Sequence, residues 1–287
     1  MACLILSRMF SVGCSHGGTP VISPPAAEES ATITASAPTS PSVSPGSSAL
    51  QNFLDGYTPT CGGKWDIRVE SLVTGETAQL CKNLADNDTM VSASLIKLFI
   101  MGAVYERVNA GALAQRDVRD ALEKMITISD NNSANKLVLL LGSGDKTAGL
   151  AAVNAFAAAI GCPDSQQNRL MLENNGLQNY TTGSDCAKIL RQIYEGKCVS
   201  EEYSAEMLSL LKAQMVNNRI PAEIPLSTVI AHKTGDLSGL SCGDVGIVFS
   251  PGGDYIICAI CNDPASDDAA ANAIAALSSA VFSYFNS

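Results

Sequence analysis

The order of strand-like and helix-like segments is the feature that most constrains the fold. Residues 64–72 (KWDIRVESL) alternate apolar and polar side chains, as a half-buried strand does. A turn at Thr74-Gly75 predicts that residues 77–81 return as the second strand of a hairpin. Three more strand-like runs come near the end of the chain, and Gly252-Gly253 predicts a hairpin between the last two. These runs are residues 229–234, 244–249 and 255–261.

Helical patterns fill the space between the two groups of strands. The predicted helices are residues 91–101, 116–127, 132–141, 150–160, 182–195 and 200–214, with a closing helix at 267–285. Residues 163–180 lack periodicity and are predicted to form a long structured loop, a kind of segment that is often functional.

Strands at both ends with helices between them are typical of the α+β class. We expect a five-stranded antiparallel sheet faced by helices, with an inserted all-helical lobe. The α/β lobe would comprise residues 51–92 and 215–287, and the helical lobe residues 93–214.

The first 50 residues are predicted to lie outside the folded domain. Residues 1–14 resemble a signal or lipoprotein segment, because a short apolar run is followed by Gly13-Cys14, a small residue before a cysteine. The alternative is an ordinary start with a misassigned first codon. Residues 15–50, rich in Ser, Pro, Thr and Ala, read as a flexible linker. We therefore expect export to the cell envelope, with Cys14 as a lipid anchor on the outer face of the cytoplasmic membrane.

Composition excludes several classes of partner and cofactor. The formal net charge of −10 argues against nucleic-acid binding. The two histidines and the absence of suitably spaced CxxC pairs predict no zinc or other metal site, and no cofactor is expected. Eight cysteines follow residue 14, an even number that permits disulfides without fixing their pairing. Cys258 and Cys261 should face opposite sides of a strand and should not pair with each other.

A serine and a lysine lie one helical turn apart at the start of an apolar segment. On a helix, Ser94 and Lys97 would share a face. A serine hydroxyl needs an adjacent base to become a nucleophile, and a lysine in an apolar environment has a lowered pKa that suits this role. Taken alone, this S-x-x-K spacing is also typical of an ordinary helix start with one snorkelling lysine.

Two further triplets make the pattern specific. Ser129-Asp130-Asn131 falls between two predicted helices, and Lys233-Thr234-Gly235 lies on a strand where the glycine permits close approach of a ligand backbone. In this order with S-x-x-K, the triplets resemble those of class A β-lactamases and penicillin-binding proteins. The resemblance extends over roughly residues 50–287 and includes SDNNSAN (129–135), Arg219-Ile220-Pro221, Pro225, His232 and the strand at 244–248.

This resemblance implies a role for each matching residue. Ser94 would become acylated, Lys97 would act as base or as partner to one, Ser129 would relay a proton, and Lys233 would keep the local field positive. Asn131 would bind the amide side chain of the substrate, and Thr234 and Lys233 would bind its carboxylate. Gly235 is also expected among the substrate-binding residues. The backbone N–H groups of Ser94 and Asp236 would form the oxyanion hole. Arg219 would either add carboxylate recognition or be an ordinary surface arginine.

The sequence departs from the family pattern at two places. The loop contains Arg169-Leu170-Met171-Leu172-Glu173-Asn174, in which Glu173 lies one residue short of the family's deacylation glutamate relative to Arg169. Glu173 is therefore either the deacylation base or an exposed loop carboxylate. Asp236 stands where the family usually has a small residue, and an acid there would repel an anionic substrate.

Three functions remain open on this sequence. The first is a class A β-lactamase-like serine hydrolase that turns over β-lactams. The second is a penicillin-binding, peptidase-like enzyme that deacylates slowly and acts on peptidoglycan peptides. The third is a non-hydrolytic envelope binding protein that kept the fold. In each case we expect a monomer with a small-molecule or peptide-like substrate.

Overall fold

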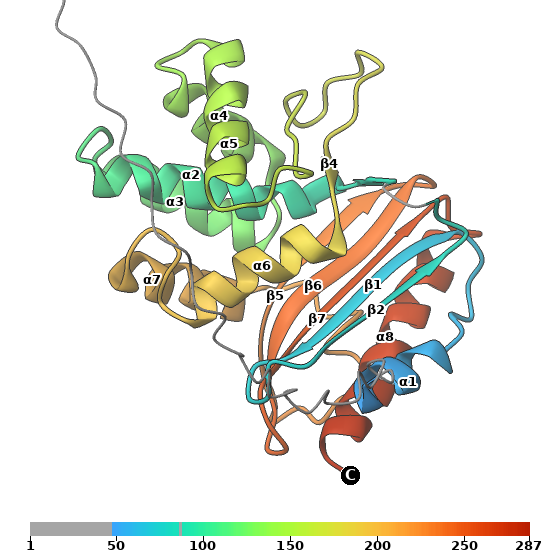
Figure 1. The fold of residues 1–287 in the computed structure, drawn as a ribbon. Coiled ribbons are helices and arrows are strands. Elements are labelled where there is room, and N and C mark those ends of the chain that lie inside the picture. The colour runs from blue at the N-terminus through green and yellow to red at the C-terminus, as the bar shows by residue number, and fades with distance from the viewer. Residues whose placement is uncertain (1–47, 86–87) are drawn as a thin grey trace, which may run out of the picture. The chain divides into compact units, whose positions relative to one another are not determined.

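A five-stranded antiparallel sheet forms the centre of the fold in the computed structural model (Figure 1). The strand order is β2-β1-β7-β6-β5. The strands are β1 (Lys64–Ser71), β2 (Thr77–Lys82), β5 (Val229–Leu237), β6 (Ser241–Phe249) and β7 (Tyr255–Asn262). The predicted fold class is therefore confirmed, and β1 joins the first hairpin to the strands from the end of the chain.

The structure describes residues 48–85 and 88–287, which lie in one compact unit, Pro45–Ser287. The predicted signal segment, 1–14, and nearly all of the predicted linker, 15–50, lie outside the described residues. Helix α1 (Ala49–Asp55) begins two residues before the predicted domain start at 51. Ser48 caps this helix by accepting a hydrogen bond from the backbone N–H of Gln51.

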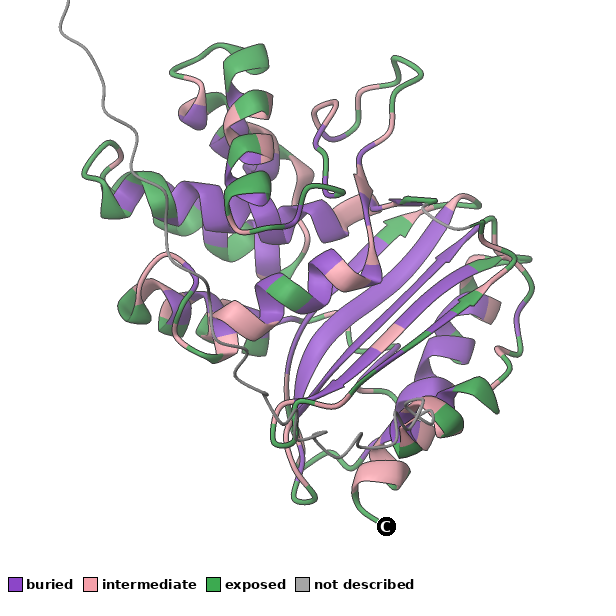
Figure 2. Ribbon diagram, in the orientation of Figure 1, coloured by how far each residue is buried: buried purple, intermediate pink, exposed green. Residues whose placement is uncertain are grey.

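Helices cover both faces of the sheet. Helices α1 and α8 (Asp267–Phe285) pack on one face, and α6 (Gly183–Tyr194) lies across the other (Figure 1). Because both faces are covered, every residue of β7 is buried (Figure 2). This explains why the sequence of β7 is a nearly continuous apolar run and does not alternate between apolar and polar residues. Cys258 contributes to the core on the α6 side and Cys261 to the core on the α8 side, as predicted from their spacing.

The remaining helices form a bundle around α2 (Lys97–Asn109). Ten residues of α2 are buried, which accounts for its almost continuous apolar sequence. The helices around it are α3 (Gln115–Thr127), α4 (Asn131–Leu141), α5 (Lys146–Ala159) and α7 (Glu201–Lys212). In the described part of the chain, no helix combines the length and apolar character needed to cross a bilayer.

The prediction of one helix over residues 91–101 was wrong at its start. Met90–Val91 form the short strand β3, which pairs with β4 (Tyr180–Thr181). A 3₁₀ turn, η1 (Ala93–Ile96), follows, and the α-helix begins only at Lys97. Pairing with a segment about 90 residues away determines this boundary, so local periodicity could not predict it.

Candidate active site

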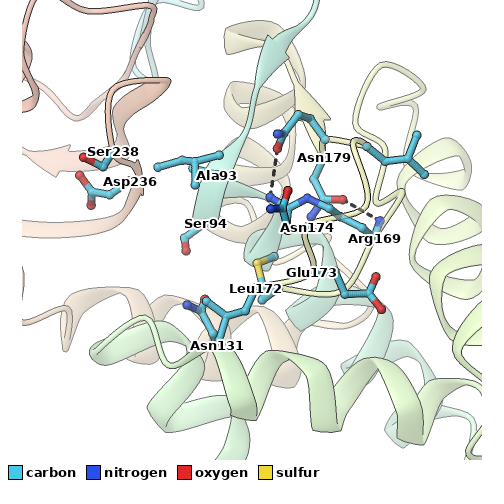
Figure 3. A pocket seen from close by; sticks show the side chains of 14 residues that line it. Ala93, Ser94, Asn131, Arg169, Leu172, Glu173, Asn174, Asn179, Asp236 and Ser238 are labelled. Atoms are coloured by element: carbon cyan, nitrogen blue, oxygen red, sulfur yellow. Dashed lines mark hydrogen bonds between the residues drawn. The ribbon is translucent and has the colours of Figure 1, made fainter.

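Ser94 lies in the η1 turn and lines a pocket of about 420 Å³ (Figure 3). The residue before it, Ala93, has φ of +45°, a conformation that L-residues rarely adopt and that is often found at functional sites. The lining residues come from η1, the start of α4, the loop at 163–180 and the end of β5. They are Ala93, Ser94, Asn131, Arg169, Met171, Leu172, Glu173, Asn174, Leu177, Gln178, Asn179, Asp236, Leu237 and Ser238.

Gly235 allows β5 to pass close to this turn. A Cβ atom at Gly235 would lie 2.8 Å from Cγ of Leu95 and 3.0 Å from the carbonyl oxygen of Ser92. The space beside this glycine is therefore filled by the protein's own turn, and not left open for a ligand backbone as predicted. Its proposed part in substrate binding stays a prediction.

Lys97 is fully buried and makes three hydrogen bonds, one of them to Asn131 of the pocket wall. Its Nζ donates to the carbonyl oxygen of Ser129 at 2.6 Å, to Ser129 Oγ at 3.3 Å and to Asn131 Oδ1 at 2.8 Å. Burial lowers the pKa of Lys97 to about 7, and the nearby negative charge of Asp130 opposes this shift only in part. Part of the Lys97 population is therefore neutral, and able to accept a proton, near neutral pH.

Ser129 joins Lys97 to the second lysine. Its Oγ accepts a hydrogen bond from Lys233 Nζ at 2.9 Å, and Lys233 Nζ also donates to the carbonyl oxygen of Thr234 at 2.7 Å. Lys233 is fully buried, and burial followed by the positive charge of Lys97 holds its pKa well below its usual range. One hydroxyl thus contacts two amines, so a proton has a continuous path of hydrogen bonds between them.

Three of the predicted catalytic side chains, Lys97, Ser129 and Lys233, meet in one hydrogen-bonded group, which reaches the Ser94 pocket through Asn131. Asn131 and Ser94 line the same pocket. Glu173 lines the pocket too, but its carboxylate points away from Ser94 (Figure 3). One oxygen of Glu173 binds Lys146 Nζ at 2.9 Å, and the other accepts from the backbone N–H of Leu170 at 3.1 Å.

These contacts favour the second of the two interpretations of Glu173, an exposed loop carboxylate, although its side chain is only 29% exposed because it binds Lys146 and its own loop. The Lys146 hydrogen bond is the main cause that holds the pKa of Glu173 below its usual value, so the group stays ionised and paired. A base that positions a deacylating water must lie within hydrogen-bond reach of that water. The orientation of Glu173 does not provide this.

Met171 and Asn179 are pocket residues that sequence reasoning missed. The side chain of Asn135, on α4, fixes the backbone of Met171 through two hydrogen bonds. Its Nδ2 donates to the Met171 carbonyl oxygen at 3.0 Å, and its Oδ1 accepts from the Met171 N–H at 2.7 Å. Asn179 binds the backbone N–H groups of Asn168 and Arg169 and thereby closes the loop. Neither Met171 nor Asn179 carries a charge or a motif that could have identified it.

Arg219 is buried, so its interpretation as a surface arginine was wrong. Its side chain is 5% exposed, and NH2 donates a hydrogen bond to Asp236 Oδ1. The Asp236 side chain is 53% exposed and lines the Ser94 pocket. Thr234, one residue before the glycine, is buried and does not line that pocket. Its predicted contact with a substrate carboxylate, like that of Lys233, stays a prediction.

The comparisons with known proteins agree with this geometry. The model of the Beta-lactamase enzyme family matches residues 46–117 and 114–285. The chain belongs to the beta-lactamase enzyme family.

Among the residues described, no group of three or more His, Cys, Asp or Glu side chains could hold a metal ion.

Individual members of the beta-lactamase family share the fold at low sequence identity. Beta-lactamase FAR-1 of Nocardia farcinica (strain IFM 10152) is 29% identical over 158 residues, or 52% of this chain. That match covers 49% of the relative, so the chain spans about half its length. The beta-lactamase of Sphaerobacter thermophilus DSM 20745 is 26% identical, with a TM-score of 0.67 over 78% of this chain and 92% of that one.

A penicillin-bound structure is also similar. It is a point mutant of PBP-A, described as an acyl-enzyme complex with penicillin G. It is 24% identical, with a TM-score of 0.68 over 80% of this chain and 92% of that one. At this identity the likeness concerns the fold alone.

Proposed function

We propose that this protein is a serine hydrolase that opens β-lactam rings through an acyl-enzyme on Ser94. The observation that carries the proposal is the position of Ser129 Oγ, which contacts both Lys97 and Lys233 beside the Ser94 pocket. Such an arrangement supplies a base and a proton relay for a hydroxyl nucleophile. Membership of the beta-lactamase family supports the same reaction class.

The residues divide the acylation step between them. Ser94 Oγ attacks the β-lactam carbonyl carbon while neutral Lys97 takes its proton. The backbone N–H groups of Ser94 and Asp236 stabilise the oxyanion. The ring C–N bond then breaks, and the nitrogen receives a proton from Ser129, which is resupplied through Lys97 and Lys233. Hydrolysis of the Ser94 ester by water regenerates the enzyme.

A second candidate function is favoured by the loop. Among the described residues that line the pocket, the carboxylates are Glu173 and Asp236, and these bind Lys146 and Arg219 respectively. Both oxygens of Glu173 are engaged and its carboxylate points away from Ser94, whereas Asp236 is bound to Arg219 through Oδ1 on the β5 side of the pocket. A penicillin-binding, peptidase-like enzyme that acts on peptidoglycan peptides, with a long-lived acyl-enzyme, fits this geometry.

Stopped-flow hydrolysis of a chromogenic cephalosporin, combined with intact-mass spectrometry, distinguishes these functions. Steady turnover supports the β-lactamase. A burst of one product per protein with a persistent adduct on Ser94 supports the slowly deacylating enzyme. No adduct on wild type, together with a Ser94→Ala variant that behaves identically, would leave only an envelope binding protein.

We propose in addition that the protein is exported and tethered to the membrane through Cys14, as a monomer. The support is the apolar run of residues 1–12, the Gly13-Cys14 pair and the Ser- and Pro-rich segment that follows. Detergent-phase partition of wild type, lost in a Cys14→Ser variant, tests the tether. Sedimentation equilibrium of the domain from residue 48 onward tests the monomer.

A further inference from the structure

The charged groups around Ser94 are arranged in an unusual way at the end of β5. Asp236 directly follows the Lys233-Thr234-Gly235 triplet, and its carboxylate lines the pocket. Its partner, Arg219, is buried and does not line the pocket, so the carboxylate covers the guanidinium on the pocket side. The strongest nearby site for an anion is therefore already occupied by a group of the protein itself.

Among the described residues, Asp236 is the carboxylate that forms an ion pair with Arg219. The Nε and NH1 atoms of Arg219 are buried without a hydrogen-bond acceptor, and Asp236 accepts from NH2. The other carboxylate near Arg219, Asp244, accepts instead from the His232 ring and the N–H of Ile220. A buried guanidinium that loses its carboxylate partner is destabilising, because its charge is then uncompensated. Asp236 is consequently held in place by the fold, and an incoming carboxylate could bind Arg219 only by displacing it.

Arg169 is the one cation among the described residues of the pocket wall, and both of its terminal nitrogens already donate to groups of its own loop. Arg169 donates to the Leu170 carbonyl oxygen at 3.2 Å and to Gln178 Oε1 at 3.0 Å. Lys233 is fully buried and does not line the pocket. Asp236 thus presents a half-exposed negative charge to any substrate that reaches Ser94, and this charge repels a carboxylate and attracts a cation.

We propose that Asp236 is a specificity-determining residue that selects acyl donors with a neutral or cationic group, rather than a carboxylate, at the β5 side of the pocket. This proposal rests on the proposed acylation of Ser94. The expected substrates are strained or activated amides that carry no free carboxylate next to the reactive bond. In these compounds the carboxylate is absent, is converted to an ester or amide, or is replaced by an amine.

A matched set of penicillins tests the proposal on the wild-type protein. The compounds are benzylpenicillin, its methyl ester and its 2-(dimethylamino)ethyl ester, which share one ring and differ in charge. The readout is the second-order rate constant of Ser94 acylation, followed by intact mass. We expect the cationic and neutral esters to react at least about tenfold faster than the acid at low ionic strength, with a smaller difference in about 1 M salt.

Two substitutions then assign the effect to Asp236. Asp236→Asn removes the charge but keeps an oxygen for Arg219, and Asp236→Ser also exposes the guanidinium. The ratio of the benzylpenicillin rate constant to the methyl ester rate constant should rise at least about tenfold in Asp236→Asn and further in Asp236→Ser. Asp55→Asn, which removes an exposed charge at the end of α1, beside β2 at the sheet edge opposite β5, is the matched control and should leave the ratio unchanged.

The outcomes separate this proposal from the proposed function. If the acid acylates wild type as fast as the esters, or if a folded Asp236→Asn protein keeps the wild-type ratio, Asp236 does not select substrates and only Ser94 acylation stands. If none of the three compounds acylates the protein, the proposed function fails, and the substrate preference fails with it. Because the wild-type series needs no variant, a poorly folding Asp236→Ser protein would not affect the test.

Discussion

The backbone of Ser129 has φ of +59°, which an L-residue other than glycine, asparagine or aspartate seldom adopts. This conformation lets one residue offer both its carbonyl oxygen and its hydroxyl to Lys97 while the hydroxyl also meets Lys233. Asp130 stabilises the conformation from the next position, because its side chain caps α4 by accepting from the N–H of Ser133 at 2.6 Å. Local strain therefore positions the proton relay.

The lowered pKa of Lys97 predicts how acylation depends on pH. The neutral amine acts as base, and it predominates above a pKa of about 7. We expect the acylation rate constant to rise with pH, to be roughly tenfold below its plateau one unit under that pKa, and to level off above it. Single-turnover acylation measured between about pH 5 and 9 checks this. A flat profile over that range would show that Lys97 is not the base.

Glu173→Gln is predicted to leave the chemistry intact. Its carboxylate binds Lys146 and the N–H of Leu170, and it points away from Ser94 (Figure 3). Acylation and deacylation rate constants should each stay within about twofold of wild type, because a partly exposed ion pair contributes only about 0–1 kcal/mol. A large loss of deacylation in this variant would instead restore Glu173 as the deacylation base.

At the scale of elements, the loop of residues 163–180 depends on α4 for its position. Asn135 binds both backbone polar groups of Met171, and Asn179 binds the other end of the same segment. Asn179 also accepts from the N–H of Ser92 through its carbonyl oxygen, at 2.9 Å, which connects the loop to the Ser94 turn. The pocket wall is thus a loop held by amide side chains, which supply donors and acceptors without charge.

Asn135→Ala should increase the mobility of the loop at residues 163–180 more than it lowers the stability of the whole domain. The variant loses two hydrogen bonds and leaves two backbone groups unpaired, at a cost of about 1–3 kcal/mol. We expect faster amide hydrogen exchange in residues 168–179 and little change in the sheet. Asn132→Ala, a neighbour on α4, serves as control. Equal amide hydrogen exchange in the two variants would mean that the Asn135 hydrogen bonds do not order the loop.

At the scale of the whole molecule, a buried carboxylate links the sheet to α6. Asp66, on β1, accepts from the N–H of Gly183 at 2.6 Å and from Gln79 Nε2 at 3.2 Å. Burial raises the pKa of Asp66, and these hydrogen bonds only partly oppose the shift. A Cβ at Gly183 would lie 2.9 Å from Asp66 Oδ1, so the glycine permits the close approach of helix and strand.

This raised pKa predicts a pH-dependent stability. In the folded state Asp66 holds its proton to a higher pH than in the unfolded state, so its protonation stabilises the fold at low pH, and that contribution is lost as pH rises through the folded pKa. Relative to Asp66→Asn, wild type should therefore lose thermal stability as pH increases from about 4 to 7. Melting temperatures over this range check the sign. Asp117→Asn, at an exposed site, should show no such trend.

The sequence by itself determined the features that depend on neighbouring residues. Alternation and apolar periodicity predicted the five strands of the sheet and the larger helices, but not α1, β3 or β4. The closing helix spans the predicted residues 267–285, because Ser266 caps it and two aspartates occupy its first turn. Spacing suggested Ser94 and Lys97, and the resemblance of the S-x-x-K pair and the two triplets to a known family implied catalytic roles for Ser129 and Lys233. Each of these signals is local or is carried by residue identity.

Tertiary structure decided everything that depends on which groups meet across the chain. Lys97 and Ser129 are 32 residues apart, Lys233 and Ser129 are 104 apart, and only packing places one hydroxyl between two buried amines. The burial of Arg219 and its ion pair with Asp236 could not be inferred from their spacing in the sequence. Likewise, the position of Glu173 in the sequence did not show which way its carboxylate points. Burial and charge pairing are properties of three-dimensional neighbours, and they determine which acids and bases are available to a substrate.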